Sequence, residues 1–211
     1  MGTISPYIEG WYRFENNGIG IGKDDSGHGR HGTVIGVSPI VGKIGGGASY
    51  DGTNDSISLP VASFIGTADA SYFTVAGWIK IPSVGNAYGL FAIINNWAFY
   101  AFPAGATVRF RMINLTTGST GIYTTSGVIP FDEWMRVAYI NNGGVLSLAI
   151  NTVLQSTYIQ PGISTTLPNS LSAVIAATTY YKGEQDEVII YNKALDTRNL
   201  KRDYAGKLPI F

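Results

Sequence analysis

The sequence contains no cysteine, and this absence excludes disulfide bonds, cysteine-ligated zinc and thiol catalysis. Charged side chains are also scarce, at 13% of the 211 residues, about half of the usual share. Because 14 Lys and Arg balance 14 Asp and Glu, the chain lacks the basic excess that nucleic-acid binding requires. No apolar run approaches the roughly 18 residues of a membrane-spanning helix. We therefore expect neither a nucleic-acid partner nor membrane insertion.

The N-terminus carries no recognisable export signal. Met1 is followed by a short polar stretch without the basic start and apolar run of a signal peptide. Pro6 stands where a myristoylation signal has Ser or Thr. Three routes remain open: the chain stays in a cytosol, its export signal lies outside this sequence, or it is released by lysis, as a virus particle is.

Glycine and apolar residues are abundant. The chain has 27 Gly, about twice the average share, together with 45% apolar and 12% aromatic residues. Disorder is excluded, because disordered chains combine low hydrophobicity with high net charge. This composition is typical of many short strands joined by tight turns, and we expect an all-β protein.

Short apolar and aromatic runs recur along the whole chain, broken by Gly, Asn, Asp and Pro. They predict strands at residues 11–15, 32–37, 48–51, 56–59, 73–81, 89–95, 98–102, 107–113, 121–125, 134–140, 145–151, 172–177 and 186–192. So many strands do not fit one flat sheet, so the sequence predicts two packed sheets. We find no linker or repeat, and expect a single domain over residues 1–211.

Local signals place one hairpin and one helix. Asn-Asn-Gly-Gly at 141–144 predicts a tight turn between two strands. Asp196 can cap a helix over 197–204, which Gly206 then ends. In the last strand, alternation places Asp186 and Val188 on one face and Glu187 on the other.

Seven motifs follow one another in a characteristic order. They are GWYRFE at 10–15, DDSGHGRHGT at 24–33, VGKIGGGASYDG at 41–52, FTVAGWIK at 73–80, EWMRVA at 133–138, LSLAIN at 146–151 and GEQDEVIIYNKAL at 183–195. In this order the chain resembles the laminin-G-like branch of the concanavalin A-like lectin/glucanase superfamily. The resemblance implies a jelly-roll β-sandwich of two antiparallel sheets with a short C-terminal helix. It departs at Asn151-Thr152, where the family often has Asp-Gly.

The resemblance also implies a metal site, which in this family is usually calcium. Calcium prefers six to eight oxygen ligands from carboxylates and backbone carbonyls. The matching candidates are Asp24, Asp25, Asp51 and Asp186. A bound calcium would be structural and would tie the N-terminal loop to the last strand. The alternative is that Asp24 and Asp25 only build a turn, bonding to local backbone N–H groups.

The two histidines, His28 and His31, lie in the same loop. With Asp24 or Asp25 they could imitate a zinc site, but a glycine-rich loop does not fix their geometry. We expect them to be exposed loop residues.

Catalysis is not expected. Glycoside hydrolases need two carboxyl groups facing each other across the substrate. Laminarinase-like members of the family carry Glu-x-Asp-x-x-Glu on one strand. Here Glu184 and Asp186 match its beginning, but Ile189 replaces the last acid, and Glu187 is expected to point to the opposite face. There is also no Gly-x-Ser-x-Gly nucleophile elbow.

Aromatic and amide side chains suggest sugar binding instead, because aromatic faces pack against sugar C–H surfaces. The candidate ligand-binding residues are Trp97, Tyr88, Asn96, Tyr180 and Tyr181. Trp97 is the preferred exposed aromatic residue. Trp11, Trp78 and Trp134 lie within the strand motifs and are predicted to be core residues.

The sequence thus predicts a surface-displayed, non-catalytic recognition domain, at a virion surface or extracellular. Its partner would be a cell-surface or polysaccharide glycan, and its place a phage particle, as a decoration or receptor-binding component. The alternatives are a structural virion or assembly protein without sugar binding, which contacts other virion proteins or forms a homo-oligomer, and a bacterial adhesin domain. A glycoside hydrolase is the least favoured reading.

Overall fold

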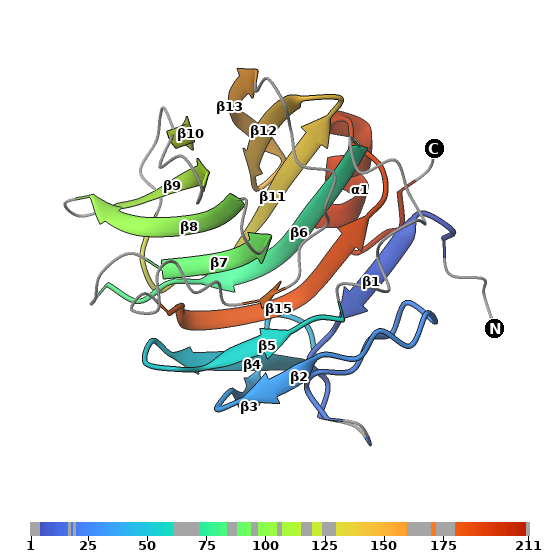
Figure 1. Ribbon diagram of the computed structural model, residues 1–211, viewed down its shortest axis with the longest axis vertical. Coiled ribbons are helices and arrows are strands. Elements are labelled where there is room, and N and C mark those ends of the chain that lie inside the picture. The colour runs from blue at the N-terminus through green and yellow to red at the C-terminus, as the bar shows by residue number, and fades with distance from the viewer. Residues whose placement is uncertain are drawn as a thin grey trace.

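The computed structural model describes residues 5–16, 18, 20–60, 72–83, 88–93, 97–104, 107–114, 120–123, 130–159, 170–171 and 180–209. These residues form fifteen strands in two antiparallel sheets and one helix (Figure 1). The predicted all-β sandwich with a short C-terminal helix is confirmed.

The first sheet has the strand order β13 (Val153–Ile159), β12 (Val145–Ile150), β11 (Met135–Asn142), β6 (Tyr72–Lys80), β15 (Lys182–Tyr191), β4 (Gly46–Asp51) and β3 (Ser38–Val41). Strand β15 is central. Its first half pairs with β4, and its second half pairs with β1 (Ile8–Tyr12). Strands β4 and β1 share one edge of β15, and β6 pairs with its other edge.

The second sheet has the order β10 (Thr120–Tyr123), β9 (Thr107–Asn114), β8 (Trp97–Ala104), β7 (Tyr88–Ile93), β14 (Ser170–Leu171), β5 (Ser56–Ser58) and β2 (Thr33–Ile35). The core lies between the two sheets, because alternate residues of each strand point inward. Val75 and Val137 of the first sheet are fully buried there, and Phe99 of the second sheet packs on Tyr139 with ring centroids 4.2 Å apart. Burying each such side chain stabilises the fold by about 1.5–3 kcal/mol.

Helix α1 (Thr197–Tyr204) covers part of the outer face of the first sheet (Figure 1). Asp196 Oδ1 accepts a hydrogen bond from Asn199 N at 2.8 Å, and Gly206 follows the helix with a φ of 67°, so both predicted end signals are confirmed. Leu200 packs with Ile189 in a second apolar cluster beneath the helix. In the described part of the chain, no helix is long and apolar enough to cross a membrane.

Three strands were not predicted from the sequence: β3, β13 and the two-residue β14. Of these, β3 and β13 lie at the edges of the first sheet. Val41 in β3 and the consecutive Val153 and Leu154 in β13 are exposed, so these apolar residues do not alternate between a buried and an exposed face, which is the pattern that prediction relies on. The first strand begins three residues earlier than predicted, at Ile8. The strand predicted at 172–177 lies outside the described residues.

Candidate functional site

A β-bulge in strand β15 shapes the outer face of the first sheet. Asp186 lies opposite Trp78 of β6, but Ile189 lies opposite Ala76, so β15 has one extra residue between these two pairs. Glu187 lies at this shift and has a positive φ of 47°. A bulge changes the direction of a side chain relative to strict alternation. Asp186, opposite the outward-facing Trp78, and Glu187 therefore both face away from the second sheet.

The bulge corrects the alternation predicted for this strand. Val188 faces the core between the sheets, whereas Ile189 and Tyr191 pack in the cluster beneath α1. Asp186 does not share the face of Val188, because the extra residue shifts the alternation. The prediction that Glu187 points to the opposite face from Asp186 is wrong.

Glu187 joins β15 to the neighbouring β1 segment. Trp11 Nε1 donates a hydrogen bond to Glu187 Oε2 at 2.5 Å, and Arg13 Nε donates to Oε1 at 3.0 Å. Tyr12 and Phe14, which alternate with these two donors, are buried in the core between the sheets. The alternation along β1 thus directs Trp11 and Arg13 to the outer face, toward the bulge.

A buried ion pair holds α1 against the same face. Arg136 of β11 donates from Nε and Nη2 to the two carboxylate oxygens of Asp203, both at 2.7 Å. Its Nη1 donates to the Glu187 backbone carbonyl, and the Tyr191 hydroxyl donates to Asp203. Burial alone would lower the pKa of Arg136, but the Asp203 carboxylate raises it, and the net pKa lies above its ordinary value. Arg136 is therefore charged, and each of its three guanidinium nitrogens donates a hydrogen bond.

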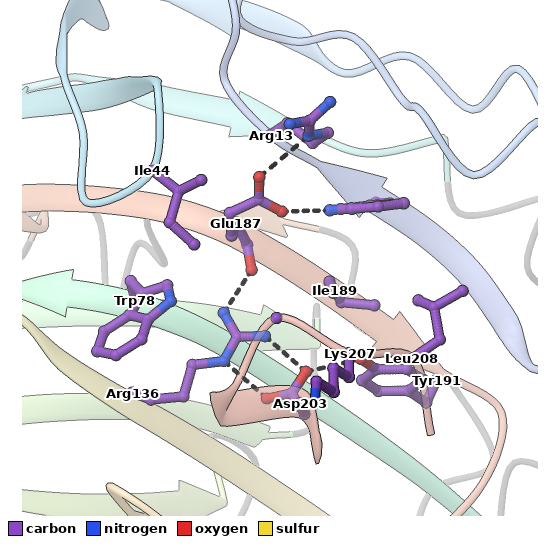
Figure 2. Close-up of a pocket in the computed structure, with 12 residues that line it drawn as sticks. Arg13, Ile44, Trp78, Arg136, Glu187, Ile189, Tyr191, Asp203, Lys207 and Leu208 are labelled. Carbon is purple, nitrogen blue, oxygen red and sulfur yellow. Dashed lines mark hydrogen bonds and ion pairs between the residues drawn. The ribbon is translucent and has the colours of Figure 1, made fainter. Parts of the chain in front are cut away.

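These elements enclose a pocket of about 250 Å³, which we call the Trp11 pocket. It is lined by Trp11, Arg13, Ile44, Trp78, Arg136, Glu187, Ile189, Tyr191, Asp203, Gly206, Lys207 and Leu208. Figure 2 shows Glu187 between Arg13 on one side and the Arg136–Asp203 pair on the other. Strands β1, β6, β11 and β15, the β3–β4 turn and α1 with the segment after it all contribute to its wall.

The lining combines apolar surface with hydrogen-bonding groups. Trp11 is partly exposed, and the Arg13 Cζ atom lies 5.4 Å from the centre of its ring. Ile44, at the rim, is 44% exposed. Glu187 and the exposed Lys207 add a carboxylate and an ammonium group. Such a lining suits a ligand with both C–H faces and polar substituents.

The tryptophans do not all lie in the core as predicted. Trp78 is buried, but on the outer face, where its ring lies 5.2 Å from that of Tyr204 of α1. Trp11 and Trp134 are partly exposed. The prediction of core positions is therefore wrong for these two. Trp11 faces the pocket, and Trp134 precedes the first residue of β11.

The carboxylate of Asp24 is saturated by local donors. Oδ1 accepts from Trp11 N at 3.0 Å and Ser26 N at 2.9 Å, and Oδ2 accepts from Ser26 Oγ at 2.8 Å and Arg30 N at 2.9 Å. Four donors use the acceptor capacity of the two oxygens. Asp24 thus has the contacts expected of the turn alternative.

The other metal candidates are dispersed. Asp25 pairs with Lys23, and the exposed Asp51 accepts a hydrogen bond from Thr53 N through its Oδ1. Asp186 is fully buried in β15. Within the described ranges, no three His, Asp or Glu side chains come together as a potential metal site. Calcium binding stays a prediction.

Among these four aspartates, Asp186 is the one with a buried side-chain oxygen that lacks a hydrogen-bond partner in the described part of the chain. Its Oδ2 accepts a hydrogen bond from Ile44 N at 2.7 Å, whereas its buried Oδ1 has no hydrogen-bond partner among the described residues. Burial raises the pKa of Asp186 to about 7, and the nearby Glu187 carboxylate also raises it. A cation or a proton at Oδ1 would remove the unfavourable buried charge.

Both histidines are exposed, as expected. His31 Nδ1 accepts a hydrogen bond from Asp24 N at 3.0 Å, which engages one of its ring nitrogens in the loop itself.

The structure describes only some of the predicted sugar-binding side chains. Asn96 and the side chains of Trp97 and Tyr88 lie outside what the structure describes. Tyr180 is partly exposed, at the start of the segment that leads into β15.

Tyr181 is not a ligand-facing residue. Its side chain is fully buried, its ring lies 5.3 Å from that of Tyr50, and its hydroxyl donates to the Glu184 carbonyl at 2.9 Å. Burial also raises its pKa. The prediction for Tyr181 is therefore wrong, because this tyrosine is part of the core between the sheets.

The acids on the outer face are each engaged or inaccessible. Glu184 pairs with Lys80 at 3.3 Å, Asp186 is fully buried, and Glu187 holds Trp11 and Arg13. This arrangement offers no evident pair of carboxyl groups flanking a substrate, but the absence of catalysis remains a prediction.

The chain matches one family model, described as the concanavalin A-like lectin/glucanases superfamily (Laminin_G_3), over residues 51–201. No curated protein matches it by sequence. Among solved structures, domain 4 of AbnA, a GH43 extracellular arabinanase from Geobacillus stearothermophilus in complex with arabinotriose, has a TM-score of 0.68 at 21% identity, covering 94% of this chain and 98% of that one.

Toxin domains share the same fold. The binding domain of Paraclostridial Mosquitocidal Protein 1 has a TM-score of 0.71 at 20% identity, covering 95% of this chain and 52% of that one. A structure of botulinum neurotoxin type C, whose cell entry is described as dependent on two ganglioside molecules, has a TM-score of 0.65 at 14% identity and coverages of 94% and 52%. The chain thus spans about half the length of these toxin domains.

Proposed function

The chain belongs to the concanavalin A-like lectin/glucanase superfamily, and on this basis we propose that it is a non-catalytic carbohydrate-recognition domain that binds sugar in the Trp11 pocket. The observation that carries the proposal is the partly exposed indole of Trp11, held at a fixed angle by Glu187 and flanked by Arg13. Rigid side chains of this kind bind sugar at a low entropic cost, since they are ordered before the ligand arrives.

The size of the pocket supports a small ligand segment. Its volume of about 250 Å³ is just below the roughly 300–1,000 Å³ typical of sites for drug-sized molecules. One or two sugar units of a longer chain fit such a space. The arabinanase domain and the botulinum neurotoxin, whose structures are described with arabinotriose and gangliosides, support a glycan as the class of ligand.

A glycan array with the wild type and the Trp11→Ala variant tests this function. We expect the wild type to bind a defined set of glycans and Trp11→Ala to bind them at least tenfold more weakly, equivalent to about 1.4 kcal/mol. The matched control is Trp134→Ala, which removes a partly exposed tryptophan outside the pocket. Equal binding by wild type and Trp11→Ala, or no glycan bound by the wild type, would contradict the proposal.

We also propose that the domain does not hydrolyse the glycans it binds. The support is the engagement of Glu184 by Lys80 and the burial of Asp186. A reducing-sugar assay on common β-glucans should detect no turnover. Turnover that disappears in Glu184→Gln would show that these acids are catalytic.

Display on a particle is part of the proposal, with a phage virion as the expected setting. Exposed apolar residues support a contact with neighbouring subunits: Val34 (37%) and Ile35 (51%) on β2, and Val41 (87%) on β3. Residues 33–41 carry no charged side chain, although charges commonly protect edge strands from association. Mass spectrometry of purified virions should detect the chain, whereas a gene beside a cell-wall anchor would favour the adhesin.

The same edge favours a second function, assembly without sugar binding. In that case the chain would form a homo-oligomer or bind another virion protein through β2 and β3. Light scattering on the wild type and on Val41→Glu would detect an oligomer that the added charge disrupts. Val153→Glu, at the other edge of the sheet, is the control.

We also propose that the domain binds a structural calcium ion through the carboxylate of Asp186. The support is that the buried Oδ1 of Asp186 lacks a hydrogen-bond partner among the described residues. At a hundredfold excess over its dissociation constant, a ligand stabilises the folded state by about 2.7 kcal/mol. A chelator should therefore lower the Tm of the wild type by several degrees and leave that of Asp186→Asn unchanged. A wild-type Tm that is the same with and without chelator would reject the calcium site.

A further inference from the structure

Positive charge is concentrated at the C-terminal end of the described chain. Five of the 14 Lys and Arg fall within residues 193–207: Lys193, Arg198, Lys201, Arg202 and Lys207. The only acids in this segment are Asp196 and Asp203, and the buried Asp203 is neutralised by Arg136. A molecule with zero net charge thus has one locally cationic surface.

These five cations form no ion pair with any described residue, whereas Arg13, Lys23, Arg30, Lys80 and Arg136 all do. Four of the five are exposed, and Arg202 is partly exposed. Arg202 Nε donates to the Leu208 carbonyl at 2.8 Å, which fixes the segment after the helix. Most of the positive charge on this surface is therefore available to an external anion.

Four of the five cations, all except Lys193, line a groove. Thr197, Arg198, Lys201, Arg202, Ala205 and Lys207 surround a volume of about 520 Å³. Lys207 also lines the Trp11 pocket. The cationic groove and the Trp11 pocket are therefore neighbours that share one side chain.

Helix stability explains only part of this charge. Lys201 and Arg202 lie in the last turn of α1, where cations interact favourably with the helix dipole. Arg198 lies in the first turn, which has no acidic residue and where a cation is unfavourable. Lys207 lies beyond the helix. Neither Arg198 nor Lys207 is placed where it would stabilise α1.

We propose that the groove and the Trp11 pocket together bind an anionic polysaccharide, with its carboxylate or sulfate groups at Arg198, Lys201 and Lys207 and a sugar ring at Trp11. Guanidinium groups bind planar oxyanions through two parallel hydrogen bonds, and lysine adds a point charge. A polymer can contact both regions at once because they share Lys207. The inference rests on the proposed function and names its ligand class.

An acidic polysaccharide fits this surface better than a membrane or a nucleic acid. Binding to an anionic bilayer or to a phosphate backbone is driven mainly by basic charge. Here the cationic groove adjoins a partly exposed tryptophan in a pocket of about 250 Å³, and the chain as a whole is neutral. This combination favours a ligand that offers both sugar faces and acidic groups.

The test measures binding of the full chain to polygalacturonate, dextran sulfate, neutral dextran and phosphatidylserine vesicles. Arg198→Glu and Lys207→Glu each reverse one charge at the groove. Lys182→Glu is the matched control, because Lys182 is exposed at the far end of β15 and reversing it changes the net charge by the same amount. Melting curves check that each variant is folded.

We expect polygalacturonate or dextran sulfate to bind, and this pair separates carboxylate from sulfate recognition. Arg198→Glu and Lys207→Glu should each weaken that binding at least fivefold, and Lys182→Glu less than twofold. Raising the salt from about 50 mM to about 500 mM should weaken it further, since salt screens exposed charges.

Three results would overturn the inference. If neutral glycans bind as well as acidic ones, and the groove variants bind normally while Trp11→Ala does not, the proposed function stands and the anionic ligand is wrong. If the chain binds only the vesicles, and the groove variants lose this vesicle binding, the cationic groove is a membrane-contact surface. If no glycan and no vesicle binds, both the inference and the proposed function are wrong.

Discussion

Asp186 is in an unusual environment for a carboxyl group. It is fully buried, one of its oxygens lacks a partner among the described residues, and burial raises its pKa to about 7. It lies opposite Trp78 on the outer face, where the backbone N–H of Ile44 in the β3–β4 turn donates a hydrogen bond to it. The sequence identified Asp186 as a candidate ligand but gave no sign of its burial, because Ile44 is 142 positions away along the chain.

This raised pKa predicts a dependence of stability on pH. In the unfolded chain the carboxyl group titrates near pH 4, and in the folded protein near pH 7. The folded state therefore binds more protons between these values, so its free energy of unfolding decreases as the pH rises from 4 to 7. In chelator, denaturant titrations of wild type and Asp186→Asn should give a stability difference that grows in favour of Asp186→Asn over this range. Parallel curves for the two proteins would show that Asp186 is ionised throughout.

Trp11 shows how much of the site could be predicted at this scale. Tyr12 and Phe14 are core residues and Trp11 and Arg13 alternate with them, so the sequence already contained the signal that these two face the other side. Trp11 was instead assigned to the core because it lies in a strand motif. Its partner Glu187 could not be found from the sequence, because the two residues are 176 positions apart and only the pairing of β1 with β15 brings them together.

At the scale of elements, the β12–β13 hairpin carries backbone strain. Asn151 and Thr152 form its two-residue turn with φ values of 47° and 74°. Asn tolerates this conformation and its Oδ1 also accepts a hydrogen bond from Arg136 N at 2.9 Å, but a β-branched residue such as Thr disfavours it. Thr152 stands at the position where the family often has Gly.

Thr152→Gly should therefore stabilise the protein by about 1 kcal/mol, because glycine adopts a positive φ without a steric penalty. Thermal unfolding would show this as a Tm increase of a few degrees. Gly143→Ala is the reverse control: Gly143 has a φ of 59° in the β11–β12 turn, and a Cβ there should lower the Tm. A Tm of Thr152→Gly below that of the wild type would contradict the strain argument.

Elements with local signals were predicted well. The cap at Asp196, the helix over 197–204 and the turn at 141–144 all depend on residues close together in sequence. Strands β3 and β13 are edge strands, and their exposed Val41, Val153 and Leu154 do not show the alternation of buried and exposed residues by which a strand is predicted. The bulge was missed because it is defined by pairing between β15 and β6, over 100 residues apart in the chain.

At the scale of the whole molecule, the sandwich was predictable and the Trp11 pocket was not. Motif order and strand number gave two packed sheets, which the structure has. The pocket instead combines β1, β6, β11, β15 and α1, and only strand order and register bring these elements together. The calcium prediction grouped four carboxylates because they match positions in the family motifs. In the structure, one of them, Asp24, accepts hydrogen bonds from its own loop and from β1.

The most direct test of the account is an NMR titration that follows the indole N–H signals of the four tryptophans while the glycan selected on the array is added. Sugar binding in the pocket should shift the signal of Trp11, whose Nε1 is hydrogen-bonded to Glu187, and leave that of Trp134 in place. Single Trp→Phe variants assign the signals. If the glycan shifts Trp97 and leaves Trp11 unchanged, the sugar binds elsewhere on the molecule and the central claim is wrong.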